Sequence, residues 1–185
     1  MVKFFGNLHA VLLVGLLLTI AVIYGIGPNG DSIHAAFRWL HTFFGVLWIG
    51  LLYYLNFVQV PTMPKVPAEL KPAVSKYIAP SVLFFFRWGA ALTVLTGLIV
   101  AHLGGYLVQA LTLDPTYRLI GVGMWLALIM AFNVWFVIWP NQKKALGIVP
   151  AEDSAKAKAA KTAMIASRFN VMLSIPMLLA MTNMH

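Results

Sequence analysis

The chain has 185 residues, of which 61% are hydrophobic and only 10% are charged, and its formal net charge is +8. A composition this apolar excludes an ordinary water-soluble domain and indicates an integral membrane protein. The absence of cysteine excludes disulfides, thiolate-held iron–sulfur clusters and a covalently attached c-type haem.

Long uncharged stretches predict five transmembrane helices, because about 20 mostly apolar residues are needed to cross the hydrocarbon core. The predicted spans cover about residues 8–26, 35–60, 81–110, 117–139 and 162–184. Prolines 61 and 140 are expected to end the second and fourth spans, and segment 151–161 to run into the fifth as continuous helix. The first stretch is longer than the ~7–15-residue apolar region of a signal peptide, so we expect it to be retained. The predicted fold is an all-α integral membrane protein, a single domain over residues 1–185 that forms a five-helix bundle.

Lysines are concentrated in two of the four connecting loops, and the other two contain none. The lysines of the second and fourth loops are Lys65, Lys71, Lys76, Lys143, Lys144, Lys156, Lys158 and Lys161. This asymmetry follows the positive-inside rule and predicts a cytoplasmic N-terminus and a periplasmic C-terminus. The positive charge is thereby explained by topology and anionic lipid, and we expect the lipid bilayer, not nucleic acid, as the partner.

Two histidines within the uncharged stretches are the main candidates for a functional site. His41 and His102 lie on different predicted spans, at nearly the same expected depth below the outer surface. Ionisable side chains are rare within a membrane and indicate function, and two imidazoles at one level are typical of a pair of axial haem ligands. We therefore predict haem b bound by His41 and His102. Zinc or copper at these residues is a weaker alternative, because a metal site would need further ligands.

Helical spacing predicts an inward-facing stripe on the second span, since polar groups in lipid turn toward the bundle interior. The stripe consists of Arg38, His41, Gly45, Trp48, Leu52, Asn56 and Gln59. We expect Gly45 to leave room for a flat macrocycle and Gly105 to do the same beside the second histidine. Arg38 is expected to hydrogen-bond a haem propionate, with Arg118 as a second candidate.

A second polar layer is predicted toward the cytoplasmic side. Its members are His9, Asn56, Arg87, Asn133, Arg168 and Asn170. Three interpretations remain open: the arginines extend to the lipid–water boundary, the cluster binds an anionic group or a quinone with His9 as its titratable member, or the asparagines join helices.

The last span carries a stripe of soft ligands at helical spacing. Met177, Met181, Met184 and His185 could together bind Cu(I), whereas methionine is also a common filler of apolar interiors.

Several long strings resemble the membrane domain of bacterial PuuD-type urate oxidases. They are HTFFGVLWIGLLYYLNFVQVP from His41, APSVLFFFRWGAALTVLTGLI from Ala79, GMWLALIMAFNVWFVIWPNQKKALG from Gly123 and SRFNVMLSIPML from Ser167. The likeness extends from about Trp39 to the C-terminus. The segment WIGLLYYL also resembles HemJ-type protoporphyrinogen oxidases, which are small b-haem membrane proteins.

The resemblance implies a haem-associated bundle in the inner membrane of a bacterium, and it places His41, Trp48, Arg87 and Asn133 in matched strings. In the PuuD-type proteins a c-type cytochrome domain follows this membrane domain, and the whole is implicated in urate oxidation. This chain has no haem-attachment motif, so we expect a relay to a c-type cytochrome to require a separate polypeptide. Urate oxidation does not follow from the membrane domain alone.

The combined prediction is a b-type haem protein that transfers electrons or serves as the membrane subunit of an oxidoreductase, with a redox partner or a larger membrane complex. Two alternatives remain, namely a cofactor-free accessory subunit of such a complex and a copper-handling membrane protein.

Overall fold

The computed structural model describes residues 2–25, 27 and 31–183, and every regular element in that part of the chain is a helix. Five helical stretches are long and apolar enough to cross a membrane: Leu8–Gly25, Ser32–Lys65, Lys71–Leu103, Arg118–Ala145 and Asp153–Thr182. The prediction of an all-α membrane protein with five spans is therefore confirmed.

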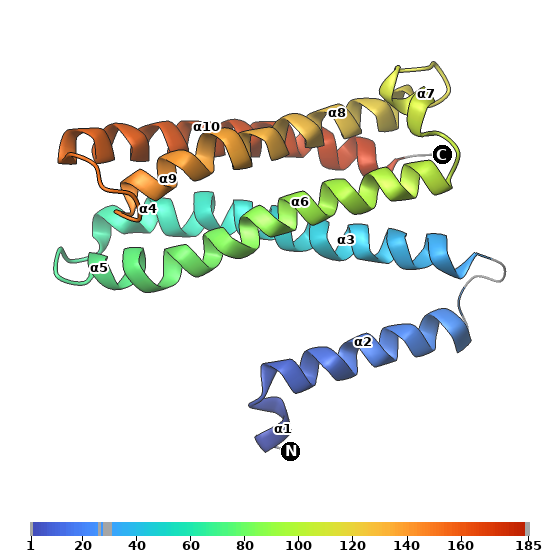
Figure 1. Ribbon diagram of the computed structural model, residues 1–185, viewed down its shortest axis with the longest axis horizontal. Helices are drawn as coiled ribbons and strands as arrows, with labels where there is room; N and C mark the ends of the chain where they lie inside the picture. Colours follow the sequence, from blue (N-terminus) through green and yellow to red (C-terminus); the bar gives the residue numbers. More distant parts are fainter. Residues whose placement is uncertain (1, 26, 28–30, 184–185) are drawn as a thin grey trace.

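Four of the five stretches pack side by side as an elongated bundle (Figure 1). The second contains α3 (Ser32–Tyr53), the π-helix η1 (Tyr54–Gln59), α4 (Val60–Thr62) and the 3₁₀-helix η2 (Met63–Lys65), and the third contains α5 (Lys71–Ala73), the π-helix η3 (Val74–Ile78) and α6 (Ala79–Leu103). The short α7 (Leu107–Leu111) leads to α8 (Arg118–Phe132), the π-helix η4 (Asn133–Ile138) and α9 (Trp139–Ala145), and α10 (Asp153–Thr182) completes the bundle.

The first span stands apart from this bundle. Helix α1 (Val2–Phe5) precedes α2 (Leu8–Gly25). Helix α2 has no buried residue, and the bundle helix that it mainly contacts is α3. Figure 1 shows α2 as a separate rod beneath the other helices. The interior is thus built by four spans, and α2 leaves most of its apolar surface exposed.

Three spans continue through prolines that were expected to end or precede them. Pro61, Pro80 and Pro140 each occupy the second position after a π-helical segment. Proline lacks an N–H, and its ring clashes with the carbonyl four residues earlier in a regular α-helix. A π-turn inserts one residue and moves that carbonyl aside, so the helix continues beyond the proline.

The core lies where α3, α6, α8, η4 and α10 meet. Trp48, Leu52, Phe86, Met130 and Val134 have no solvent exposure. Close approach of α3 and α6 is possible because Gly89 on α6 faces the backbone of Trp48, where an added Cβ would lie 3.4 Å from its Cα. Of the predicted inward stripe of the second span, Trp48, Leu52 and Asn56 are buried, whereas Arg38 is exposed.

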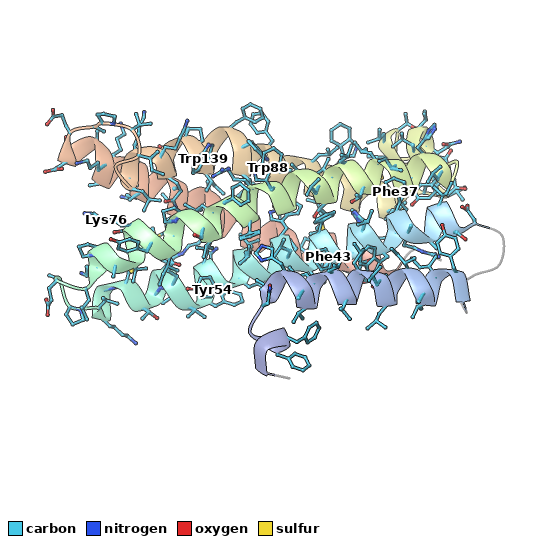
Figure 2. All side chains as sticks on the ribbon, turned by 60° about the horizontal axis from the view of Figure 1, so that its bottom comes forward. Phe37, Phe43, Tyr54, Lys76, Trp88 and Trp139 are labelled. Carbon is cyan, nitrogen blue, oxygen red and sulfur yellow. The ribbon has the colours of Figure 1, made fainter. Side chains whose placement is uncertain are left out.

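The outer surface of the bundle is apolar, and its two ends differ in charge. Phe43, Tyr54 and Trp88 point away from the bundle, as expected of side chains that face lipid (Figure 2). The C-terminal end of α10, the start of α3 and helix α7 share one end, whereas α4, α5 and the connection between α9 and α10 share the other (Figure 1). The second end contains the lysine-rich loops.

Candidate functional site

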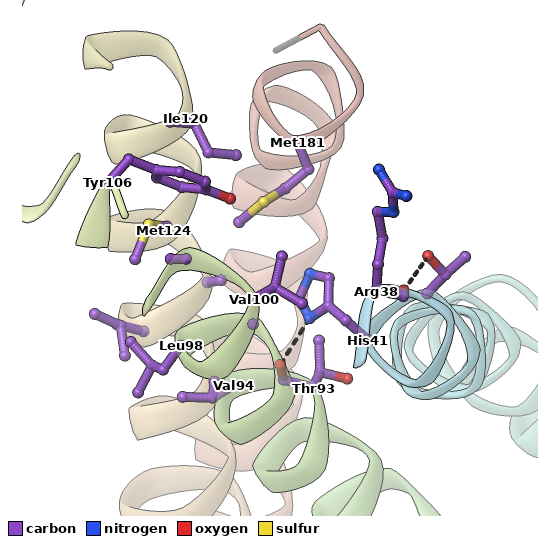
Figure 3. Close-up of a pocket in the computed structure, with 15 residues that line it drawn as sticks. Arg38, His41, Thr93, Val94, Leu98, Val100, Tyr106, Ile120, Met124 and Met181 are labelled. Atoms are coloured by element: carbon purple, nitrogen blue, oxygen red, sulfur yellow. Dashed lines mark hydrogen bonds between the residues drawn. The ribbon is translucent and has the colours of Figure 1, made fainter. Parts of the chain in front are cut away.

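A cavity of about 360 Å³ lies inside the bundle toward the end that carries α7. This volume falls within the range of about 300–1,000 Å³ that is typical of ligand pockets. The walls come from α3, α6, α8 and α10, with Tyr106 between α6 and α7, and most lining side chains are apolar (Figure 3).

His41 is the imidazole that faces this cavity. Its Nδ1 lies 2.8 Å from the backbone carbonyl oxygen of Thr93, and because a carbonyl only accepts, Nδ1–H is the donor (Figure 3). In the neutral ring, Nε2 therefore keeps its lone pair, and the side-chain hydrogen bond of His41 among the described residues is the one through Nδ1. A histidine held by one nitrogen through a backbone carbonyl, with the other nitrogen free, has the arrangement of a metal-ligating imidazole.

Gly97 provides the space that the His41 ring occupies. A Cβ at this position would lie 2.7 Å from Cε1 and 2.9 Å from Nδ1 of His41, which is closer than side chains tolerate. Gly97 lies one turn beyond Thr93 on α6, so the same face supplies both the hydrogen-bond acceptor and the gap. Gly45, which was expected to leave room for a macrocycle, instead faces Thr93, whose Cγ2 would be 3.8 Å from an added Cβ.

The lining of the cavity also contains a cation and a phenol. Arg38 and Tyr106 both line the cavity, and the side chain of Arg38 is exposed. The Tyr106 ring stacks on Tyr117 with centroids 5.4 Å apart. Burial raises the pKa of the Tyr106 phenol above its usual value, so the hydroxyl is neutral at physiological pH.

The structure does not bring His102 to the cavity. Gly104 and Gly105 end α6 at Leu103, seven residues before the predicted end of the span, and Gly105 adopts a positive φ of 74° that suits a glycine in a tight turn. His102 consequently lies in the last turn of α6 with an exposed side chain, while His41 lies well inside α3. The expected matching depth of the two histidines is not found. Arg118 is likewise exposed and does not line the cavity.

The predicted inner polar residues mostly join helices. The Asn56 amide donates to the Ser167 hydroxyl at 2.7 Å, which links η1 to α10. The Asn133 amide donates to the Asn170 side chain at 3.0 Å, and Asn170 donates to the Met130 carbonyl at 2.9 Å. These hydrogen bonds correspond to the helix-joining interpretation of the asparagines.

The charged members of that layer do not gather into one site. The Arg87 guanidinium lies over the Trp139 ring, 3.5 Å from its centroid, and its buried Nε has no hydrogen-bond partner within the described part of the chain. His9 on α2 and Arg168 on α10 have exposed side chains. Arg87 is thus held against an aromatic ring, whereas His9 and Arg168 are exposed.

The methionine stripe of the last span is divided between two environments. Met177 is buried in the core, and Met181 lines the cavity. Met184 and His185, the other predicted copper ligands, lie outside the described residues. Within residues 2–25, 27 and 31–183 there is no group of three or more His, Asp or Glu side chains that could hold a metal ion.

Sequence reasoning missed several residues of the cavity, namely Thr93, Gly97, Tyr106 and Met124. The spacing of Thr93 and Gly97, four residues apart on one helical face, is a signal that could have found two of them. Nothing in the sequence indicates that this face meets His41, because that contact depends on how α3 and α6 align.

Together, the helices and the cavity define a multi-pass membrane protein whose bundle encloses a ligand-sized space near one end. Residues 106–185 match the sequence model of the family described as Urate oxidase N-terminal. The match confirms the predicted resemblance to the membrane domain of PuuD-type urate oxidases over this part of the chain. It includes the strings that begin at Gly123 and Ser167, whereas those that begin at His41 and Ala79 precede it. Comparison with curated proteins and with solved structures found no match.

Proposed function

We propose that this protein is a b-type haem protein of the bacterial inner membrane, acting in electron transfer as the membrane part of an oxidoreductase system. The observation that supports the proposal most directly is the His41 imidazole, whose Nδ1 is held by Thr93 while its Nε2 remains free beside the cavity. The urate oxidase N-terminal match points to an oxidoreductase-related membrane protein.

The residues around the cavity fit a haem in their chemistry. His41 would bind the iron through Nε2, and Arg38 at the open side would neutralise a propionate. Val94, Leu98 and Leu128 supply apolar walls that would pack against a macrocycle and exclude water. A cavity of about 360 Å³ with one open side is far larger than a bare copper ion requires, which favours haem over copper.

When bound, haem supplies a one-electron ferric–ferrous couple. Electrons would pass singly between this bundle and a redox partner, for which we propose a c-type cytochrome. The family name connects this membrane domain with urate oxidation, and the oxidation of urate by two electrons would require two such transfers.

The proposed orientation places the lysine-rich end of the bundle in the cytoplasm and the cavity near the periplasmic surface. The chain has no cysteine, so single cysteines give a background-free test. We expect a membrane-impermeant maleimide to label Thr116→Cys in cells with a permeable outer membrane, and Lys158→Cys only after the inner membrane is lysed. Both positions are exposed, so the reverse pattern contradicts this orientation.

The visible spectrum of the detergent-purified protein, oxidised and then reduced with dithionite, tests the haem proposal. We expect sharp reduced α-bands and a haem that pyridine extracts. His41→Ala should lose most of the haem, whereas His102→Ala, which changes an exposed histidine near the same end, should retain it. A colourless wild-type protein without metal would contradict the proposal and favour a cofactor-free accessory subunit. A His41→Ala protein with undiminished haem would show that the ligand assignment is wrong.

A further inference from the structure

A second ligand of the type that haem iron accepts lines the same cavity as His41. Met181 on α10 contributes its side chain to the wall, and Figure 3 shows its thioether between the Tyr106 ring and the His41 ring, with its end nearest the Tyr106 hydroxyl. We propose that the Met181 sulfur is the second axial ligand of the haem, which gives His/Met in place of bis-histidine ligation. This inference rests on the proposed function and specifies its site.

The position of Met181 is fixed by a close contact between α8 and α10. A Cβ added at Gly123 would lie 3.0 Å from the Cβ of Ala180 and 3.5 Å from both Cγ and Cε of Met181. The absence of a side chain at Gly123 therefore lets Met181 lie directly against α8. The His41 ring lies over Gly97 in the same manner, so each proposed ligand is held against a glycine of a neighbouring helix.

Met181 is better placed than the other donors near the cavity. Met124 also lines it, but it is a buried member, 8% exposed, of a cluster with Ala101, Ala110 and Ile120, against which Met181 packs as a partly buried side chain. In Figure 3, Met124 lies beyond Tyr106, whereas Met181 occupies the side nearer to His41. His102, the histidine of α6, is exposed outside the cavity.

A thioether ligand has a definite consequence for electron transfer. Sulfur of methionine is a soft ligand that favours ferrous over ferric iron, and His/Met ligation gives a higher reduction potential than ligation by two histidines. The site would therefore accept electrons readily from a donor and suit a high-potential acceptor such as a c-type cytochrome.

Spectroscopy of purified variants tests the assignment independently of any activity. We expect ferric wild-type protein to be low-spin and to show the weak far-red charge-transfer band of sulfur-ligated haem. Met181→Leu, which keeps the apolar volume, should lose that band, become high-spin and bind carbon monoxide faster in the ferrous state. Met181→His should restore the low-spin spectrum at a lower midpoint potential in a redox titration.

Met124→Leu is the matched control, because it makes the same substitution on another wall of the same cavity. It should keep the band, the low-spin state and the wild-type potential. If Met181→Leu still binds haem through His41 and stays low-spin with its band intact, this inference is overturned. The proposed function then still stands. Loss of the band in Met124→Leu would instead assign the ligand to α8, and this result also overturns the inference that Met181 is the ligand. Wild-type protein without haem overturns the proposed function itself.

Discussion

At the scale of single residues, the site depends on one missing methyl group. Gly97 lies so close to His41 that any side chain there would displace the imidazole from its hydrogen bond to Thr93. The contact between Gly97 and the His41 ring involves no charge and no backbone strain. It depends only on the absence of a side chain at Gly97. Shape of this kind is sensitive to the smallest substitution, because interiors are close-packed.

Gly97→Ala should therefore lower haem retention and destabilise the protein by about 1–3 kcal/mol, the usual cost of overpacking. Thermal unfolding in detergent and the ratio of haem to protein measure the two effects. Gly50→Ala is the control, because nothing lies within 4 Å of a Cβ added there, and alanine is the better helix former by about 1 kcal/mol. Equal haem content in Gly97→Ala and wild type would show that the ring tolerates displacement.

At the scale of helices, the bundle is assembled through small residues that allow close approach. Gly89 meets Trp48 where α6 crosses α3, and Gly123 meets Ala180 where α8 crosses α10. Without a strong hydrophobic force between helices in lipid, such contacts and the asparagine hydrogen bonds determine which helices pair. The α8–α10 contact also carries Met181, so packing and site share one interface.

A cysteine pair can test the α8–α10 contact directly. Gly123→Cys with Ala180→Cys should form a disulfide under mild oxidation, since a Cβ at Gly123 would lie 3.0 Å from that of Ala180, close to the ~3.5–4.5 Å range of disulfides. The readout is a mobility shift after proteolysis between α9 and α10. Gly50→Cys with Ala180→Cys should not cross-link, because nothing lies near Gly50. Cross-linking of both pairs, or of neither, contradicts the described packing.

At the scale of the whole molecule, the chain consists of a four-span bundle and one nearly independent span. Helix α2 has no buried residue, whereas α10 packs against α8, η4 and α9 along much of its length. Helix α2 is therefore held beside the bundle mainly by its covalent connection and a few contacts with α3, while α10 is held by its contacts with α8, η4 and α9.

Cleavage at engineered protease sites should reveal this difference. After cutting between Gly30 and Asp31, we expect the α2 fragment to separate from the bundle on size-exclusion chromatography, with the haem remaining on the larger fragment. After cutting between Val149 and Pro150, the two fragments should elute together because α10 stays docked. Retention of α2 after the first cut would indicate contacts beyond those described.

The sequence predicted what depends on local pattern and missed what depends on alignment between helices. Five spans and the inward position of Trp48 follow from hydrophobic runs and helical period, which are properties of a single segment. The pairing of His41 with His102 required knowing where α6 ends, and the Gly104–Gly105 turn ends it earlier than hydrophobicity indicates. Met181 was recognised only as part of a soft-ligand stripe, since its approach to the cavity depends on Gly123 of a different helix.

The isolation of α2 also determines how freely this part of the chain can vary. Few neighbours constrain the shape of its side chains, so residues that suit lipid should be interchangeable at most positions between Leu8 and Gly25. Substitutions there should accumulate over generations without selection against them, while Gly97 and Gly123 stay fixed by what they contact. Helix α2 is thus a replaceable module, and an unrelated apolar span of the same length and orientation should serve in its place.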